Sequence, residues 1–173
     1  MKRQIMNIAD VELQESPVPR PPQLDKKYGG AKLGPIAPLL GAKKLGYNLT
    51  VVPPGRRAFP FHSHRVNEEM FFIIEGAGEV RLGGETHPIR QGDIIACPPG
   101  GPEVAHQIIN TGDSELKYLA VSTKLSPEIG EYPDSNKFGV LAHFPGDDGK
   151  PEVFRFLGRA DASLGYYDGE PEE

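Results

Sequence analysis

The sequence predicts an all-β protein, an antiparallel barrel or sandwich, on three observations. First, 21 Gly and 18 Pro among 173 residues argue against a helical bundle, because Gly costs about 1 kcal/mol and Pro about 3 kcal/mol in a helix interior. Second, short runs rich in β-branched and aromatic residues fill positions 46–124. Third, turn signals separate these runs at intervals of about eight to twelve residues. No internal repeat is visible, which favours one barrel rather than two.

Each predicted strand ends at a turn that the sequence marks. "GYNLTVV" at 46–52 precedes the turn "PPG", and "EMFFIIEG" at 69–76 ends in a glycine. "GEVRLGGETHPI" at 78–89 has the alternation and the central Gly-Gly pair of a β-hairpin. The series is completed by three further runs, "IIAC" at 94–97, "VAHQIIN" at 104–110 and "ELKYLAVSTK" at 115–124.

Two segments of looser pattern flank the predicted barrel, which spans residues 46–124 of a single domain. Residues 1–45 are interrupted by Pro and Gly, and they predict an irregular N-terminal arm that lies on the barrel or on a second subunit. Residues 125–173 predict a C-terminal extension that packs on the barrel, with candidate short strands around 139–143 and 152–156.

Composition excludes several classes of function. The formal net charge is −5 and basic residues are not clustered, which argues against a nucleic-acid-binding surface. No apolar stretch approaches the ~20 residues of a membrane-spanning helix, and the start of the chain lacks the apolar core of a signal peptide. The single Cys97 cannot form an internal disulfide, which fits a reducing compartment. We therefore expect a cytoplasmic protein that binds neither nucleic acid nor membrane.

Two histidines one residue apart stand out in the stretch "FHSHRVNEEMFFIIE" at 61–75. Side chains alternate faces along a strand, so His62 and His64 point the same way if the stretch is extended. Such a pair is half a metal site, although surface strands also carry it by chance. His106, on a later apolar strand, offers a third imidazole. Three imidazoles and a carboxylate suit Fe(II), Mn(II), Co(II), Ni(II) or Zn(II).

Two spaced motifs resemble the two signatures of the cupin superfamily. The first is G-x6-H-x-H-x4-E-x6-G, which begins at Gly55 and ends at Gly76. The second begins at Gly92, continues as P-x-G at 98–100 and ends as H-x3-N at 106–110. The first histidine of the first motif stands one residue later than the usual signature places it, and that of the second motif three residues later. Both changes lengthen a loop and remove no ligand. The resemblance implies a double-stranded β-helix, a jelly-roll-like barrel.

The resemblance also implies the metal ligands, which are His62, His64, Glu69 and His106. Spacing from Gly76 favours Glu69 over its neighbour Glu68, and strand alternation agrees, because it places Phe71 and Ile73 on the face of Glu69. Glu68 is then expected on the rim, as a group that orients a ligand imidazole or serves as an acid or base. One divalent transition metal ion is the expected cofactor.

Three imidazoles and one carboxylate leave two open positions on an octahedral ion, where Lewis-acid or oxygen chemistry can occur. The chain resembles a group of uncharacterised bacterial single-domain cupins, some of them described as sugar-phosphate isomerases. The first hypothesis is therefore a small metalloenzyme that acts on a small polar or anionic molecule, with isomerase chemistry. The alternatives are an iron-dependent dioxygenase and a metal cupin that binds a small ligand without turnover. The arm and the β-rich edge predict a homodimer.

Overall fold

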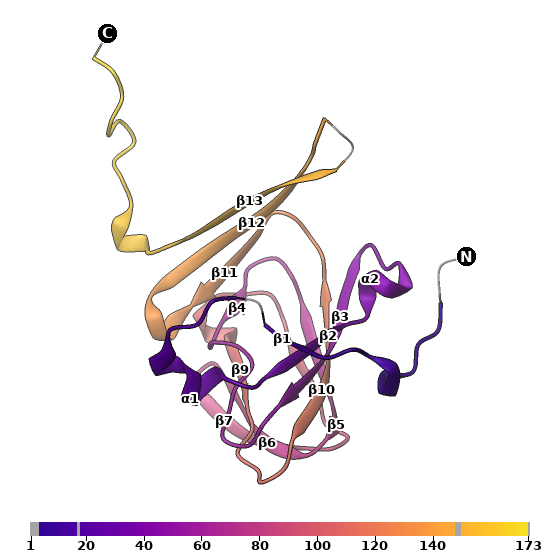
Figure 1. The fold of residues 1–173 in the computed structure, drawn as a ribbon. Coiled ribbons are helices and arrows are strands. Elements are labelled where there is room, and N and C mark those ends of the chain that lie inside the picture. The colour runs from indigo at the N-terminus through magenta and orange to yellow at the C-terminus, as the bar shows by residue number, and fades with distance from the viewer. Residues whose placement is uncertain (1–3, 17, 148–149, 173) are drawn as a thin grey trace.

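The structure is a computed structural model that describes residues 4–16, 18–147 and 150–172 (Figure 1). Strands dominate it, as the composition predicts, and the helices are single short turns. The strands are β1 Gln14–Glu15, β2 Lys32–Pro35, β3 Leu45–Val52, β4 Ser63–His64, β5 Glu69–Glu75, β6 Ala77–Leu82, β7 Glu85–Arg90, β8 Ile94–Cys97, β9 His106–Ile109, β10 Leu116–Thr123, β11 Glu128–Tyr132, β12 Lys137–Pro145 and β13 Pro151–Gly158. The α-helices are α1 Asp25–Tyr28 and α2 Ala37–Leu40, and the 3-10 turns are η1 Ile8–Asp10, η2 Pro22–Leu24, η3 Pro102–Val104, η4 Pro133–Ser135 and η5 Ala160–Ala162.

Two antiparallel sheets enclose the core of the barrel. The larger has the strand order β1-β2-β3-β10-β5-β8, and the smaller has the order β7-β6-β9. This is the double-stranded β-helix that the two motifs imply. Its core is a cluster of buried side chains from both sheets: Val52, Phe71, Ile73, Val80, Ile89, Ile95, Cys97, Ile108, Leu116, Tyr118 and Ala120.

The hairpin predicted at 78–89 forms between β6 and β7, with Leu82 opposite Glu85 across a two-residue turn. Gly83 has a φ of 55°, a conformation that favours glycine. On β5, Phe71 and Ile73 are buried, whereas Phe72 between them is 38% exposed. Alternation therefore gives this strand the register expected from the sequence.

The N-terminal arm lies on the barrel and extends its larger sheet. β2 pairs with β3, and β1 pairs with β2. Val11 and Ile36 from the arm pack with Leu49 and Val51 of β3 in a second apolar cluster. The arm therefore shares an apolar core with the barrel.

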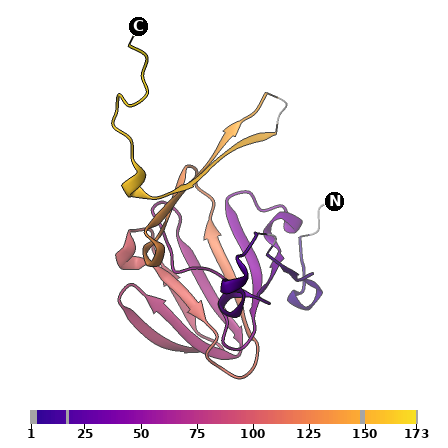
Figure 2. The ribbon, with the colours of Figure 1, turned by 60° about the vertical axis from the view of Figure 1, so that its left-hand side comes forward.

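The C-terminal extension forms a four-stranded sheet with a strand of the barrel region. Its order is β13-β12-β11-β4, so β4, which carries His64, pairs with β11. The β12–β13 hairpin projects away from the barrel, and the chain after it leads further outward (Figures 1 and 2). Among the described residues, no helix combines the length and the apolar character that crossing a lipid bilayer requires.

Candidate metal centre

Four side chains from three separate parts of the fold meet at one point. One ligand atom from each of His62, His64, Glu69 and His106 lies within 4.8 Å of the others. His64 is the last residue of β4, Glu69 is the first of β5 and His106 is the first of β9. The structure thus brings together all four residues that the motifs single out.

Backbone pairing sets this convergence. His62 and His106 exchange two backbone hydrogen bonds, of 3.1 and 2.7 Å, and form an isolated antiparallel bridge. The carbonyl of His64 accepts a hydrogen bond of 2.8 Å from the N–H of Gly100. Gly100 ends the P-x-G part of the second motif, so a backbone hydrogen bond joins the two motifs at the ligand His64.

The three imidazoles direct the same nitrogen at one carboxylate oxygen. Glu69 Oε2 lies 2.9 Å from Nε2 of His106, 3.5 Å from Nε2 of His64 and 4.0 Å from Nε2 of His62. Imidazole nitrogens gathered around a carboxylate oxygen form the donor set that divalent transition metals prefer.

An unpartnered nitrogen in this cluster fits a bound ion. Nε2 of His64, the nitrogen that faces Glu69, is buried without a hydrogen-bond partner among the described residues. An unpaired buried polar atom costs free energy, about 1–3 kcal/mol for a typical group. His62 differs, because its Nδ1 lies 2.9 Å from the carbonyl oxygen of Pro60. A proton donated there leaves the Nε2 lone pair free for a metal.

Burial and mutual proximity shift the ionisation of the cluster. The pKa of His62 is lowered from 6.5 to about 4, first by burial and then by His106 and His64. Burial raises the pKa of the Glu69 carboxyl, but its contacts with His106 and His64 outweigh burial and hold that pKa well below its usual value. At neutral pH the site therefore offers a neutral His62 and an ionised Glu69, which are the forms that bind metals.

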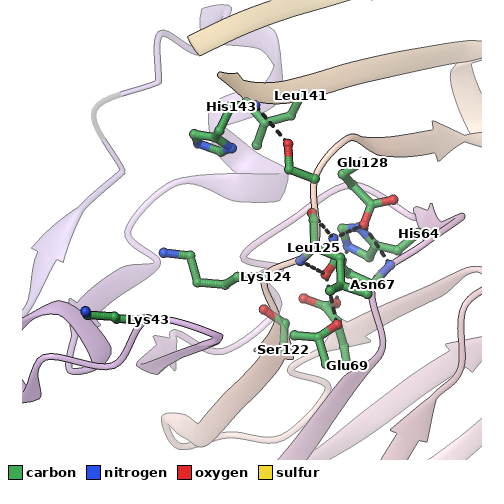
Figure 3. Close-up of a pocket in the computed structure, with 12 residues that line it drawn as sticks. Lys43, His64, Asn67, Glu69, Ser122, Lys124, Leu125, Glu128, Leu141 and His143 are labelled. Carbon is green, nitrogen blue, oxygen red and sulfur yellow. Dashed lines mark hydrogen bonds and ion pairs between the residues drawn. The ribbon is translucent and has the colours of Figure 1, made fainter. Parts of the chain in front are cut away.

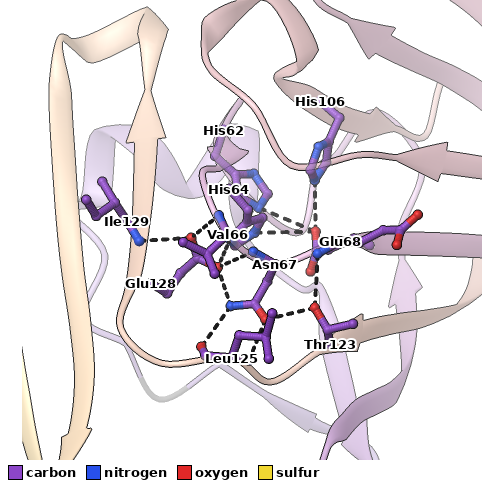
Figure 4. Close-up of polar contacts among 11 residues, drawn as sticks. His62, His64, Val66, Asn67, Glu68, His106, Thr123, Leu125, Glu128 and Ile129 are labelled. Atoms are coloured by element: carbon purple, nitrogen blue, oxygen red, sulfur yellow. Dashed lines mark hydrogen bonds and ion pairs between the residues drawn. The ribbon is translucent and has the colours of Figure 1, made fainter.

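A second carboxylate, absent from the sequence prediction, lies on the outer side of His64. Glu128 is 8% exposed, and its Oε2 is 3.7 Å from Nδ1 of His64 (Figure 4). Glu128 lies 59 residues after Glu69 in the chain. It stands in a segment without a motif, so no local signal identified it. Glu68, the residue proposed from sequence for an outer role, is exposed and its carboxylate points away from the imidazoles (Figure 4).

A pocket of about 390 Å³ gives access to the cluster from the side of His64 and Glu69 (Figure 3). Its size is within the range of small-molecule sites. His62 and His106 do not line this pocket; with Phe71 and Tyr118, among others, they line a separate cavity of about 10 Å³. The pocket is lined by Lys43, His64, Asn67, Glu69, Ser122, Thr123, Lys124, Leu125, Ser126, Glu128, Leu141 and His143.

Comparison with known proteins agrees with this architecture. Residues 48–122 match the cupin domain family. An uncharacterised protein of Methanocaldococcus jannaschii is 38% identical over 72 residues, which cover 42% of this chain and 54% of that protein. An oxalate-binding protein of Thermotoga maritima is 34% identical over 70 residues, which cover 40% of this chain and 54% of that protein. The chain thus spans about half the length of these two curated relatives.

A solved structure resembles nearly the whole chain. The crystal structure of a sugar phosphate isomerase of the cupin superfamily from Silicibacter pomeroyi aligns with a TM-score of 0.76 and 24% identity. The alignment covers 92% of this chain and 94% of that one. The similarity in fold therefore extends beyond the barrel to the N-terminal arm and the C-terminal extension. The motifs, the double-stranded β-helix and the match over residues 48–122 lead to one conclusion: this chain contains a cupin domain.

Proposed function

We propose that this protein is a metalloenzyme that acts on a small anionic molecule, with chemistry of the sugar-phosphate-isomerase kind. One observation carries the proposal: three imidazole nitrogens converge on one Glu69 oxygen beside a pocket of about 390 Å³. The four ligand side chains would hold one Fe, Mn, Zn, Ni or Co ion. When bound, such an ion supplies a Lewis acid for a substrate oxygen.

Two lysines support an anionic substrate. Lys43 and Lys124 line the pocket that reaches Glu69 and His64 (Figure 3). Both are exposed, and neither ammonium group makes an ion pair with another described residue. Ammonium groups bind phosphate and carboxylate oxygens by charge-assisted hydrogen bonds. The lysines would therefore bind the anionic end of the substrate, and the polar remainder would extend toward the imidazoles.

Isomerisation also needs a group that takes a proton from the carbon beside the carbonyl and returns it to the neighbouring carbon. His143 is our candidate, because it lines the same pocket and is not one of the four ligands (Figure 3). Glu68, the acid or base considered from sequence, does not line this pocket. Ser122 lines it as well, and its hydroxyl group is suited to a substrate hydroxyl.

Binding without turnover is the second candidate, and a specific comparison favours it. A relative 34% identical over 70 residues is named an oxalate-binding protein. The lysine pair and the imidazole cluster of the present chain would serve such a ligand equally well, since a dicarboxylate can contact a metal at one end and an ammonium group at the other.

Turnover assays separate these functions. The metal-loaded protein is incubated with aldose and ketose phosphates and followed by NMR for interconversion, while oxygen consumption is followed separately with small phenols and diketones. We expect interconversion, and we expect His143→Asn to lower kcat by about the 10²–10⁴-fold that an acid–base group contributes. Oxygen consumption would instead indicate the dioxygenase, and a saturable thermal shift without turnover would indicate a binding protein.

The lysines have a matched control. Lys43→Ala combined with Lys124→Ala is expected to raise KM at least tenfold, which corresponds to about 1.4 kcal/mol of lost interaction. Lys32→Ala changes an exposed lysine on β2 that does not line the pocket, and it is expected to leave KM unchanged. Equal KM values for all three proteins would remove the lysines from the substrate site.

We also propose that the protein is a homodimer, and the outermost strand of the extension supports this. Among the described strands, β13 pairs only with β12, so no described strand covers its other edge. Val153, Phe154 and Leu157 on this strand are 50%, 53% and 58% exposed. A free edge with apolar side chains is a site for pairing with another chain.

A further inference from the structure

The buried carboxylate of Glu128 is held in place by four N–H groups. Its Oε1 accepts hydrogen bonds from the backbone N–H of Val66, at 3.2 Å, and of Ile129, at 2.8 Å. Its Oε2 accepts one of 2.8 Å from the backbone N–H of Asn67 and another from the side-chain amide of Asn67. A buried charge needs such partners, and four donors match a group that only accepts.

These bonds fix the short segment between two of the proposed ligands. Val66 and Asn67 lie between His64 on β4 and Glu69 on β5. The side chain of Asn67 holds the same segment to the chain that follows β10. Its Oδ1 accepts from the hydroxyl of Thr123 at 2.8 Å and from the N–H of Leu125 at 2.7 Å (Figure 4). The extension and the segment that carries the ligands therefore form one hydrogen-bonded unit.

Glu128 also faces the imidazole of His64 directly. Oε2 of Glu128 lies 3.7 Å from Nδ1, while Oε2 of Glu69 lies 3.5 Å from Nε2 on the opposite side of the ring. The first distance exceeds a hydrogen bond, so the contact acts through charge. The charge of Glu128 favours a proton on Nδ1, in competition with the charge of Glu69 beside Nε2. A proton on Nδ1 leaves the lone pair on Nε2, toward the cluster.

His62 shows the same arrangement with a different acceptor. Its Nδ1 lies 2.9 Å from the carbonyl oxygen of Pro60, and its Nε2 faces Glu69. Metal-bound histidines generally have an acceptor on the second nitrogen, which fixes the tautomer and the ring orientation. For His64, Glu128 is the carboxylate in that place.

We infer that Glu128 is a positioning residue of the metal centre: from the C-terminal extension it orients His64 and fixes the segment that joins His64 to Glu69. The inference deepens the proposed function and rests on the four side chains being metal ligands. It gives the extension a role in the site, because the barrel strands alone lack this carboxylate. Loss of Glu128 is then expected to weaken the metal site through His64.

Metal affinity and the tautomer of His64 test this inference in the full chain. Affinities for Zn(II) and Mn(II) are measured by competition with a chelator, and 15N NMR of the metal-free protein reports which nitrogen of His64 carries the proton. We expect Glu128→Gln to reduce metal affinity about 10–100-fold and to move the proton of His64 away from Nδ1. Glu131→Gln is the matched control on β11, because Glu131 pairs with Arg65 at 2.8 Å instead. It is expected to change neither readout.

A double-mutant cycle separates positioning from general stability. In the His64→Ala background, Glu128→Gln should cause a smaller further loss of metal affinity than it causes alone, because the part of its effect that acts through His64 is already gone. It should still lower the melting temperature of the metal-free protein. An undiminished further loss of metal affinity in that background, or wild-type affinity and tautomer in Glu128→Gln, would overturn the inference.

Two further outcomes distinguish failure of the inference about Glu128 from failure of the proposed function. If Glu128→Gln does not fold, Glu128→Asp provides the test, since it keeps the charge but withdraws it from His64. Reduced metal affinity then supports the inference, and wild-type affinity overturns it. If the wild-type protein binds no divalent metal, the proposed function fails, whereas the tautomer measurement still decides whether Glu128 orients His64.

Discussion

Glu69 is the residue at the centre of the candidate metal site. Its Oε2 faces Nε2 of all three histidines, and the nearest of these nitrogens is 2.9 Å away. No other carboxylate belongs to the cluster identified among the described residues. In the metal-bound protein it would therefore be the one anionic ligand, and its neighbour Glu68 would contribute little.

We therefore predict that Glu69→Gln weakens metal binding far more than Glu68→Gln. The neutral amide is a poorer donor to a divalent cation, and the expected loss exceeds the ~10–100-fold typical of residues outside the ligand set. Metal-linked stabilisation, ~2.7 kcal/mol when metal stands at a hundred times its Kd, should be lost with it. Metal content after dialysis and the melting shift with Mn(II), Fe(II) or Zn(II) measure both effects. Equal losses of affinity in the two variants would mean that the faces of β5 are assigned wrongly by one residue.

His62 gives a prediction for pH. Burial lowers the pKa of its imidazole from 6.5 to about 4. Between these values the unfolded chain binds a proton at His62 and the folded protein does not. The free energy of unfolding therefore falls as the pH falls through this window, and the contribution of His62 is complete above a pH of about 6.5. We expect the metal-free wild type to lose stability relative to His62→Asn as the pH is lowered from 6.5 to 4.

Melting temperatures of the two metal-free proteins between pH 7.5 and 4 provide the measurement. His87→Asn is the control, because His87 lies on β7 with a side chain that is 50% exposed. Its offset from wild type should vary less with pH than that of His62→Asn. His64 cannot produce the expected trend, since Glu69 and Glu128 outweigh burial and raise its pKa. A constant offset between wild type and His62→Asn would contradict the prediction.

At the scale of elements, glycines fix where strands end. Gly76, the last residue of the first motif, connects β5 to β6 with a φ of 86°. A Cβ at this position would lie 2.5 Å from the carbonyl oxygen of Glu115. Side chains are disfavoured both by this backbone conformation and by contact with a backbone atom that cannot easily move.

Gly76→Ala is therefore expected to lower the free energy of unfolding by about 1–3 kcal/mol, the range for a residue held in a sparsely populated conformation. Gly84→Ala is the matched control, because Gly84 lies in the β6–β7 turn with no atom within 4 Å of the added Cβ. Urea denaturation of both variants gives the comparison. Equal stability of the two would mean that the β5–β6 connection relaxes without cost.

The strands were predictable wherever the pattern is local. Alternation on β5 and the Gly-Gly turn of the β6–β7 hairpin are properties of adjacent residues, and the structure confirms both. The run at 94–97 forms the predicted strand β8, but it is buried on one face only, and Ile94 is 70% exposed. β8 is the last strand of its sheet, and an apolar run does not reveal whether a strand will lie at an edge.

The residues of the candidate site also divide into those that local sequence predicts and those that depend on long-range pairing. The spacing of His62, His64 and Glu69 is local, and a resemblance in spacing added His106. Glu128 depends on the pairing of β11 with β4, which joins residues more than sixty positions apart. Neither alternation nor turn chemistry specifies such a pairing, because a strand has the same pattern whichever partner it meets.

At the scale of the whole molecule, the metal centre lies where the barrel meets the C-terminal extension. β4 contributes His64 and pairs with β11, and β11 begins with Glu128. The same sheet ends in the projecting β12–β13 hairpin (Figure 2). Exposed apolar side chains gather there, on a strand that buries none of its residues except in part at Gly158. Exposed apolar patches of this kind mark sites of interaction.

We predict that this surface is covered by a second copy of the chain. The solution mass should be twice the chain's 18.9 kDa, measured by light scattering. Successive side chains point to opposite faces of a strand, so Val153→Lys combined with Phe154→Glu places charge on both faces of β13. This double variant should be monomeric, because burying unpaired charge in an interface is costly.

Ile94→Lys is the control, since it also places a charge at an exposed apolar position. That position is on β8, an edge strand of the six-stranded sheet. It should remain dimeric. A wild-type mass of one chain would refute the dimer, and a dimer that survives the double change on β13 would place the interface elsewhere. Because β13 reaches the metal centre only through β12 and β11, the monomeric variant should bind metal with reduced affinity if docking also holds Glu128 in place. Unchanged affinity would show that the extension positions His64 without help from a second subunit.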